Sequence, residues 1–304
     1  MTLLQKIISS KACLTVLLPL ASVVALVQPA RAEDTAFLWE IESPNNTVYL
    51  LGSIHLLRPT DYPLSEAIQT AFEDAENVVF EVDLAETSSP QTATAILEAA
   101  MPDGPDEILA TALDEETYDL AQATAADLGL PFIGFHRFEP WMFYVNITVA
   151  KLIQLGFDPT YGIDTYLFNS ANEADKDVLA LETIDEQLGF LDNLSAPIQA
   201  DLVEQTLLEL DTLETVVDSM VSAWKSGDVS TFEGFITEGF VDFPEVYDAL
   251  LVQRNQNWIP VIESFINQSD DYLIVVGAAH LVGENNVVEL LQESGYTVEQ
   301  TGGN

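Results

Sequence analysis

The sequence is poor in cysteine, histidine and basic residues. Only 1 of its 304 residues is cysteine and 3 are histidine, while 50 acidic residues stand against 9 basic ones. A single cysteine excludes an intrachain disulfide framework and any metal cluster held by several thiolates. The formal net charge of -41 disfavours nucleic acid as a partner, because a polyanion gains no electrostatic energy from a phosphate backbone.

Several catalytic sequence motifs are also absent. The chain contains no H-E-x-x-H, G-x-S-x-G, G-x-G-x-x-G or P-loop motif. We therefore do not expect a zincin-type protease, a hydrolase with a nucleophile elbow, or a nucleotide site built on a glycine-rich loop.

The first 32 residues have the composition of a secretory signal peptide. Lys6 and Lys11 give a basic start, residues 12–27 are mostly apolar, and Ala30-Arg31-Ala32 is a small-x-small cleavage pattern. We expect cleavage after Ala32, a periplasmic or secreted mature protein, and no stable membrane insertion. An uncleaved anchor is the alternative, although the apolar run is short for a membrane span.

Cleavage would leave six basic residues, which are Arg58, Arg137, Lys151, Lys176, Lys225 and Arg254. So large an excess of negative charge keeps a protein soluble, especially where salt screens its self-repulsion. Any anionic substrate or transition state must therefore be stabilised by one of these six side chains, by a metal ion or by backbone N–H groups.

Short apolar runs alternate with long helical segments along the chain. The pattern predicts strands at 36–42, 47–51, 78–83, 178–182, 272–276 and 296–298. Strands alternating with helices favour an α/β fold, in which a central mixed or parallel β-sheet is flanked by helices. We expect one domain over residues 33–304, with long helical insertions between strands at about 86–175 and 184–268.

Two of the three histidines follow an apolar strand with the same spacing. Each strand is followed by Gly-x-x-His, as Gly52 to His55 and as Gly277 to His280. Glycine permits a sharp turn and a close ligand approach, and ligands of open α/β sheets bind beyond the carboxyl ends of the strands. We predict that both histidines meet there. Alternatively, each closes a strand–helix junction, which is the role expected of His136.

Carboxylates end other predicted strands. Glu81 and Asp83 follow one strand, and Glu182 follows another. Two imidazoles with a carboxylate form a ligand set suited to Mn²⁺, Co²⁺, Fe²⁺ or Zn²⁺, and such an ion activates water and polarises a carbonyl. We predict His55, His280 and Glu81 as metal ligands, with Glu81 as ligand or general base. Asp83 and Glu182 either support the site or are solvated acids.

One of the few basic residues, Arg254, lies in a predicted helix. Near a metal–carboxylate site it would orient Glu81 or stabilise an oxyanion, and otherwise it forms a surface ion pair. Arg58 is a candidate for the same roles, because it follows His55 by three residues. Asp164 belongs either to a substrate wall formed by Tyr161–Asp164 or to an ordinary helix start.

These segments, in this order, resemble the TraB/GumN family, the bacterial relatives of the TIKI metalloproteases. The matching pieces lie within residues 36–300 and are Leu50–His55, Phe80–Asp83, Tyr161–Asp164, Leu181–Thr183 with Gln187, Arg254–Asn255 with Trp258, and Val276–His280. The resemblance implies a fold like that of erythromycin esterases and ChaN-type proteins, and peptide hydrolysis that depends on Mn²⁺ or Co²⁺. It places His55, Glu81, Arg254 and His280 at functional positions.

Taken together, the motifs predict a metal-dependent hydrolase, a metallopeptidase that acts on a peptide or protein substrate outside the cytoplasm. One alternative is a metal-independent, esterase-like hydrolase in which His55 is the general base that activates water. The other is a non-catalytic protein that binds a metal, haem or a peptide in the same crevice.

Overall fold

The computed structural model describes residues 35–87, 89–102, 104 and 107–301, and these belong to one compact unit. The predicted signal peptide lies outside the described residues. Within the described part of the chain, no helix combines the length and apolar character needed to cross a membrane.

A six-stranded mixed β-sheet has the strand order β4-β3-β5-β2-β1-β6. Its strands are β1 (Leu38–Glu42), β2 (Thr47–Ser53), β3 (Asn77–Phe80), β4 (Asp177–Ala180), β5 (Tyr272–Gly277) and β6 (Glu299–Gln300). Strands β2, β5, β3 and β4 run parallel to one another, whereas β1 is antiparallel to both β2 and β6. The predicted α/β fold with a mixed sheet is confirmed.

Two strands differ from the sequence prediction. The run 178–182 was expected to be buried, but β4 pairs only with β3 at the edge of the sheet, so Asp177 and Leu179 are exposed. The last strand begins later than expected, because the N–H of Tyr296 donates to Leu291 O and completes the turn that ends the preceding helix.

Helices occupy the connections between the strands. Between β2 and β3 lie the 3₁₀ turn η1 (Pro59–Asp61) and α1 (Glu66–Asp74). Between β3 and β4 lie α2 (Leu84–Thr87), α3 (Pro90–Ala99), α4 (Leu109–Ala112), α5 (Glu115–Asp127), η2 (Phe132–Gly134), α6 (Pro140–Gln154), η3 (Pro159–Tyr161) and α7 (Ile163–Glu173). Between β4 and β5 lie α8 (Ile184–Asp192), α9 (Ala196–Glu209), α10 (Leu213–Lys225), α11 (Val229–Phe240), α12 (Pro244–Tyr247), the π-helical turn η4 (Asp248–Val252) and α13 (Gln253–Ile266). After β5 come η5 (Ala278–Leu281) and α14 (Val287–Glu293).

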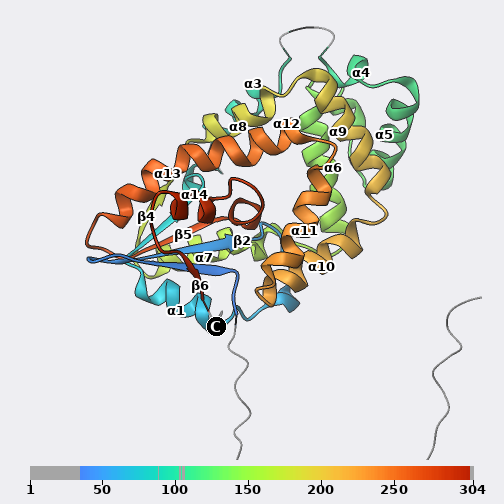
Figure 1. Ribbon diagram of the computed structural model, residues 1–304. Helices are drawn as coiled ribbons and strands as arrows, with labels where there is room; N and C mark the ends of the chain where they lie inside the picture. The colour runs from blue at the N-terminus through green and yellow to red at the C-terminus, as the bar shows by residue number, and fades with distance from the viewer. Residues whose placement is uncertain (1–34, 88, 103, 105–106, 302–304) are drawn as a thin grey trace, which may run out of the picture. The chain divides into compact units, whose positions relative to one another are not determined.

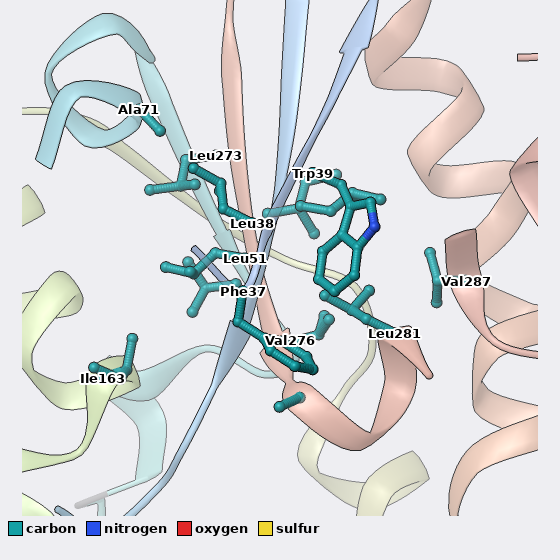
Figure 2. Packing of buried hydrophobic residues seen from close by; sticks show 14 of the residues in the cluster. Phe37, Leu38, Trp39, Leu51, Ala71, Ile163, Leu273, Val276, Leu281 and Val287 are labelled. Carbon is teal, nitrogen blue, oxygen red and sulfur yellow. The ribbon is translucent and has the colours of Figure 1, made fainter. Parts of the chain in front are cut away.

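Helices cover both faces of the sheet. Ala71 of α1 and Ile163 of α7 lie on one side, and Val287 of α14 lies on the other (Figure 2). Trp39 points toward the side of Val287, and its neighbour Leu38 points to the opposite side, as the two-residue period of a strand requires. Burial on both faces explains why the parallel strands are continuous apolar runs.

The helical insertions also have a core of their own. Phe143 and Ile147 of α6 pack in one buried cluster with Val203 and Leu207 of α9. Figure 1 shows α4, α5, α6 and α9 gathered together, away from the sheet. The insertions are therefore packed structures that can carry binding surfaces of their own.

Glycine is required at position 52 because the neighbouring atoms leave no room for a side chain, and not because the backbone turns there. Gly52 lies inside β2, and neither it nor Gly277 has a positive φ, contrary to the expectation of a sharp turn. A Cβ at Gly52 would stand 2.5 Å from Phe37 Cδ1 and 3.1 Å from Ala278 Cα. The carbonyl of Gly52 also accepts a buried hydrogen bond from Trp224 Nε1 at 2.6 Å.

We expect Gly52→Ala to lower the free energy of unfolding by about 1–3 kcal/mol, the usual cost of overpacking a core. The matched control is Gly234→Ala in α11, where a Cβ meets nothing within 4 Å and should raise stability by about 0.5–1 kcal/mol. Urea unfolding measures both. Equal changes in the two variants would contradict the packing argument.

Candidate functional site

The sheet brings the predicted site residues to one edge. His55 follows β2, Glu81 follows β3, and His280 lies in η5 directly after β5. Strand β5 lies between β2 and β3 and runs parallel to both, so the carboxyl ends of all three strands meet. This is the edge at which ligands of open α/β sheets bind.

The three side chains border one small space beside Gly277. A Cβ at this glycine would stand 3.2 Å from Glu81 Oε1, 3.5 Å from His55 Nε2 and 3.6 Å from His280 Cδ2. The second Gly-x-x-His glycine therefore keeps open the space between the predicted functional groups.

A buried arginine joins the acids to one of the histidines. Arg254 Nη2 donates to Glu81 Oε2 and to Glu182 Oε1, both at 2.6 Å, and its Nε donates to Glu182 Oε1 at 3.0 Å. Its Nη1 lies 3.2 Å from Leu250 O and 3.0 Å from His280 Nε2. The side chain of Arg254 is only 9% exposed. Arg254 therefore forms buried ion pairs, and the alternative of a surface ion pair is wrong.

Hydrogen bonds fix the tautomer of His280. Its Nδ1 lies 2.6 Å from Asn255 Oδ1, while Asn255 Nδ2 donates to Asn285 O at 3.0 Å. The amide of Asn255 therefore presents its oxygen to the ring, so Nδ1 carries the proton and Nε2 accepts from Arg254. Burial lowers the pKa of His280 to about 3, which keeps the ring neutral.

Glu81 is held as a carboxylate by surrounding donors. The N–H of Gly277 donates to Oε1 at 2.6 Å, and Gln187 Nε2 donates to Oε2 at 3.1 Å. Burial by itself would raise the pKa of Glu81, but the charge of Arg254 together with the neighbouring histidines and the Gly277 N–H outweighs it, and the pKa falls to about 2.

Glu182 and Trp258 close the buried side of the group. Trp258 Nε1 donates to Glu182 Oε2 at 3.0 Å, and its ring packs 4.5 Å from the ring of His280.

We use the name His55/Arg254 cluster for the residues of this site, which are Ser53, His55, Glu81, Asp164, Glu182, Gln187, Arg254, Asn255, Trp258 and His280.

Local sequence signals place the helices that reach the cluster. A capping box formed by Thr183 and Glu186 starts α8 directly after Glu182, and this brings Gln187 to Glu81. The π-helical turn η4 immediately precedes α13, which begins one residue before Arg254. Such turns are rare and often occur at functional sites.

His55 is the exposed member of the cluster. Its side chain is 61% exposed, and its Nδ1 lies 2.8 Å from Asp164 Oδ2. Ser53 Oγ donates to the other oxygen of Asp164 at 2.8 Å. The carboxylate of Asp164 raises the pKa of His55 to about 9, and it leaves Nε2 as the nitrogen that faces the space beside Gly277.

Other candidates lie apart from the cluster. Arg58 pairs with Asp218, donates to Leu155 O and stacks on Phe157. Asp83 lies beyond the end of β3 and accepts from the N–H of Ala85, so the two-residue period of a strand does not place it beside Glu81. His136 bonds to the hydroxyl of Tyr118.

Comparison with known proteins decides the family. The model of the TraB/PrgY/gumN family matches residues 37–300. The chain belongs to the TraB/PrgY/gumN family. It is 25% identical to YbaP of Escherichia coli (strain K12) over 82% of this chain and 89% of YbaP.

Relatives named metalloproteases also match. The chain is 24% identical to Metalloprotease TIKI2 of Danio rerio, over 90% of this chain and 62% of that protein. It is 23% identical to Metalloprotease TIKI1 of Homo sapiens, over 90% of this chain and 63% of that protein. No solved structure gives a significant match.

The geometry of this family member tests the predicted metal ligands. Among the described residues, no three His, Cys, Asp or Glu side chains are arranged to hold a metal ion. The Nε2 lone pair of His280 faces Arg254, and both oxygens of Glu81 accept N–H donors. As arranged here, the donors do not fit a metal ion, although their chemistry suits one.

Several members of the cluster have no role that the sequence alone predicts. Asn255, Gln187 and Trp258 belong to segments shared with the TraB/PrgY/gumN family, but their contacts depend on where helices α8 and α13 dock. Ser53 could have been considered, because it ends the strand that directly precedes the Gly-x-x-His histidine His55.

We expect Arg254→Ala to lower the free energy of unfolding by about 3–5 kcal/mol, because it leaves two buried carboxylates without their cation. The control is Lys225→Ala, which removes a 41% exposed cation that pairs with Asp61 at 3.4 Å and should cost less than about 1 kcal/mol. Urea unfolding at neutral pH compares them. Similar losses in both variants would contradict the buried network.

Proposed function

We propose that this chain is a hydrolase that cleaves peptide bonds in a peptide or protein substrate outside the cytoplasm, at the exposed side of the His55/Arg254 cluster. One observation carries the proposal: solvent-exposed His55 presents Nε2 to the same small space that Glu81 and His280 border. The relatives named metalloproteases support hydrolysis of a peptide bond, and the signal-peptide pattern supports the location.

His55 supplies the proton transfer when no metal ion occupies its Nε2. When its ring is neutral, the proton on Nδ1 points to Asp164, and Nε2 accepts a proton from the water that attacks the substrate carbonyl. Asp164 then stabilises the imidazolium, and Ser53 holds Asp164 in place. The ring must first lose the proton that Asp164 favours, since the pKa of His55 is raised to about 9.

Arg254 supplies positive charge and rigidity. Its five N–H groups are all directed at acceptors within the described residues, so it has no spare donor for a substrate oxygen. Its charge nevertheless stabilises an oxyanion that develops in the neighbouring space, because a fixed cation in a buried site needs little reorganisation.

In the first form of the proposal, the enzyme uses a divalent metal ion, with Mn²⁺ or Co²⁺ favoured over Zn²⁺ or Fe²⁺. Two observations support a metal ion. The TIKI relatives are named metalloproteases, and two imidazoles with a carboxylate form a ligand set suited to such an ion. His55, His280 and Glu81 would hold the ion, which would lower the pKa of bound water and polarise the carbonyl. His280 Nε2 can bind it only after Arg254 Nη1 leaves.

In the second form, the enzyme hydrolyses its substrate without a metal. The observation that favours it is the contact between Arg254 Nη1 and His280 Nε2, which occupies a predicted ligand atom with a cation of the chain itself. Among the described residues of the cluster, the exposed His55 is then the general base, and ester substrates become as suitable as peptides.

The test is peptide-library cleavage by the chelator-treated protein, before and after addition of Mn²⁺ or Co²⁺. In the metal-free form His55→Ala should lower kcat/KM by about 10²–10⁴-fold, the usual contribution of a general base. In the metal-dependent form the same variant should abolish activity, because the ion would lose a ligand. The matched control is His136→Gln, which changes a histidine outside the cluster and should leave kcat/KM unchanged.

The two forms give different results in the same assay. Activity that is lost with chelator and restored by Mn²⁺ or Co²⁺ supports the metal-dependent form, and chelator-insensitive activity supports the metal-free form. Tight peptide binding with no cleavage under any condition would contradict hydrolysis and favour a binding protein.

A further inference from the structure

A large hollow lies next to the His55/Arg254 cluster, between α8 on one side and α12 with η4 on the other. Its volume is about 850 Å³, and Phe190, Leu194 and Pro244 give it an apolar lining. Figure 1 shows α8 alongside α12. Volumes of this size are typical of sites that bind small molecules or short peptide segments.

Both walls of the hollow carry carboxylates. Asp185 and Glu186 come from α8, and Glu245 and Asp248 come from the opposite wall. All four residues are exposed, and no lysine, arginine or histidine is among the described lining residues. Because no described cation forms a salt bridge with them, their charge is available to a positively charged ligand.

One layer of side chains separates the hollow from the cluster. The ring of Phe190 lines the hollow, and the Cζ of Arg254 lies 6.0 Å from its centroid. Gln253 also lines the hollow and directly precedes Arg254. Gln187, on the same helix as Phe190, donates to Glu81. A ligand in the hollow would therefore lie one side-chain layer from Arg254, and a peptide bound there would extend beyond the hollow to reach His55.

A second hollow of about 360 Å³ lies beside the first. The two share Asn193, Leu194 and Ser195, and the second is also lined by acidic residues such as Glu98. Two neighbouring hollows suit an extended chain better than a single ion. In agreement, the described residues contain no group of acids arranged to hold a metal.

We propose that this hollow is the substrate groove and that it selects peptide segments carrying lysine or arginine side chains. The aliphatic stems of such residues would pack on Phe190 and Leu194, while their charged ends reach Asp185 and Glu245. The inference rests on the proposed hydrolase function for its role, but the binding itself can be measured separately.

The first experiment measures binding without cleavage. A fluorescein-labelled peptide of alternating alanine and lysine is titrated into the full chain carrying His55→Ala, followed by fluorescence anisotropy. Adding Asp185→Asn and Glu245→Gln together should weaken Kd by about tenfold, because one charge is lost from each wall. A peptide of alternating alanine and glutamine should bind weakly to both proteins.

The matched control changes the same charge elsewhere. Glu116→Gln with Asp119→Asn alters two exposed acids on α5, and Glu116, like Asp185 and Glu245, lies in the first turn of its helix. This pair should leave Kd unchanged. An equal loss of affinity in both double variants would overturn the groove, since attraction would then come from the overall charge of the protein.

The second experiment measures selectivity in cleavage. Active protein should cleave lysine- and arginine-containing library peptides with higher kcat/KM than matched glutamine peptides, and Asp185→Asn with Glu245→Gln should reduce that ratio by about tenfold. Cleavage with no preference for basic peptides would overturn the groove and leave the hydrolase proposal standing. Groove-dependent binding with no cleavage would support the groove and overturn the hydrolase proposal.

Discussion

The guanidinium of Arg254 is the interaction on which the candidate site depends. It joins Glu81, Glu182 and His280, which come from segments that are far apart in the sequence, and it does so with its side chain 9% exposed. Two buried carboxylates would be costly without this cation. In a chain with 50 acids and 9 bases, a buried arginine of this kind cannot be replaced by a neighbouring one.

The fold was largely predictable because its strands are short apolar runs in the middle of helical sequence. The apolar runs located β1, β2, β3 and β5. The exposure of Leu179 was not predictable, because whether an apolar strand lies at the centre or the edge of a sheet depends on its partners. The separate packing of α6 against α9 likewise depends on tertiary contacts.

The candidate site was predictable only as a set of residues. The repeated Gly-x-x-His spacing and the strand-end position of Glu81 named side chains that the structure brings to one edge. The contact of Arg254 with Glu81 was one of the alternatives for this residue. Its contact with His280 was not evident, because Arg254 approaches His280 from a helix whose docking no local pattern specifies. The same contact separates the two forms of the proposed chemistry, since a lone pair that accepts from a guanidinium is not available to a metal.

The most direct test of this account is the protonation of His280, measured by long-range ¹H–¹⁵N NMR on metal-free protein with labelled histidine. Because burial lowers the pKa of His280 to about 3 and Asn255 fixes its tautomer, the ring should stay neutral, with the proton on Nδ1, from pH 8 down to about pH 5. A proton on Nε2, or titration near the ordinary histidine pKa of about 6.5, would contradict the Arg254–His280 contact and the network built on it.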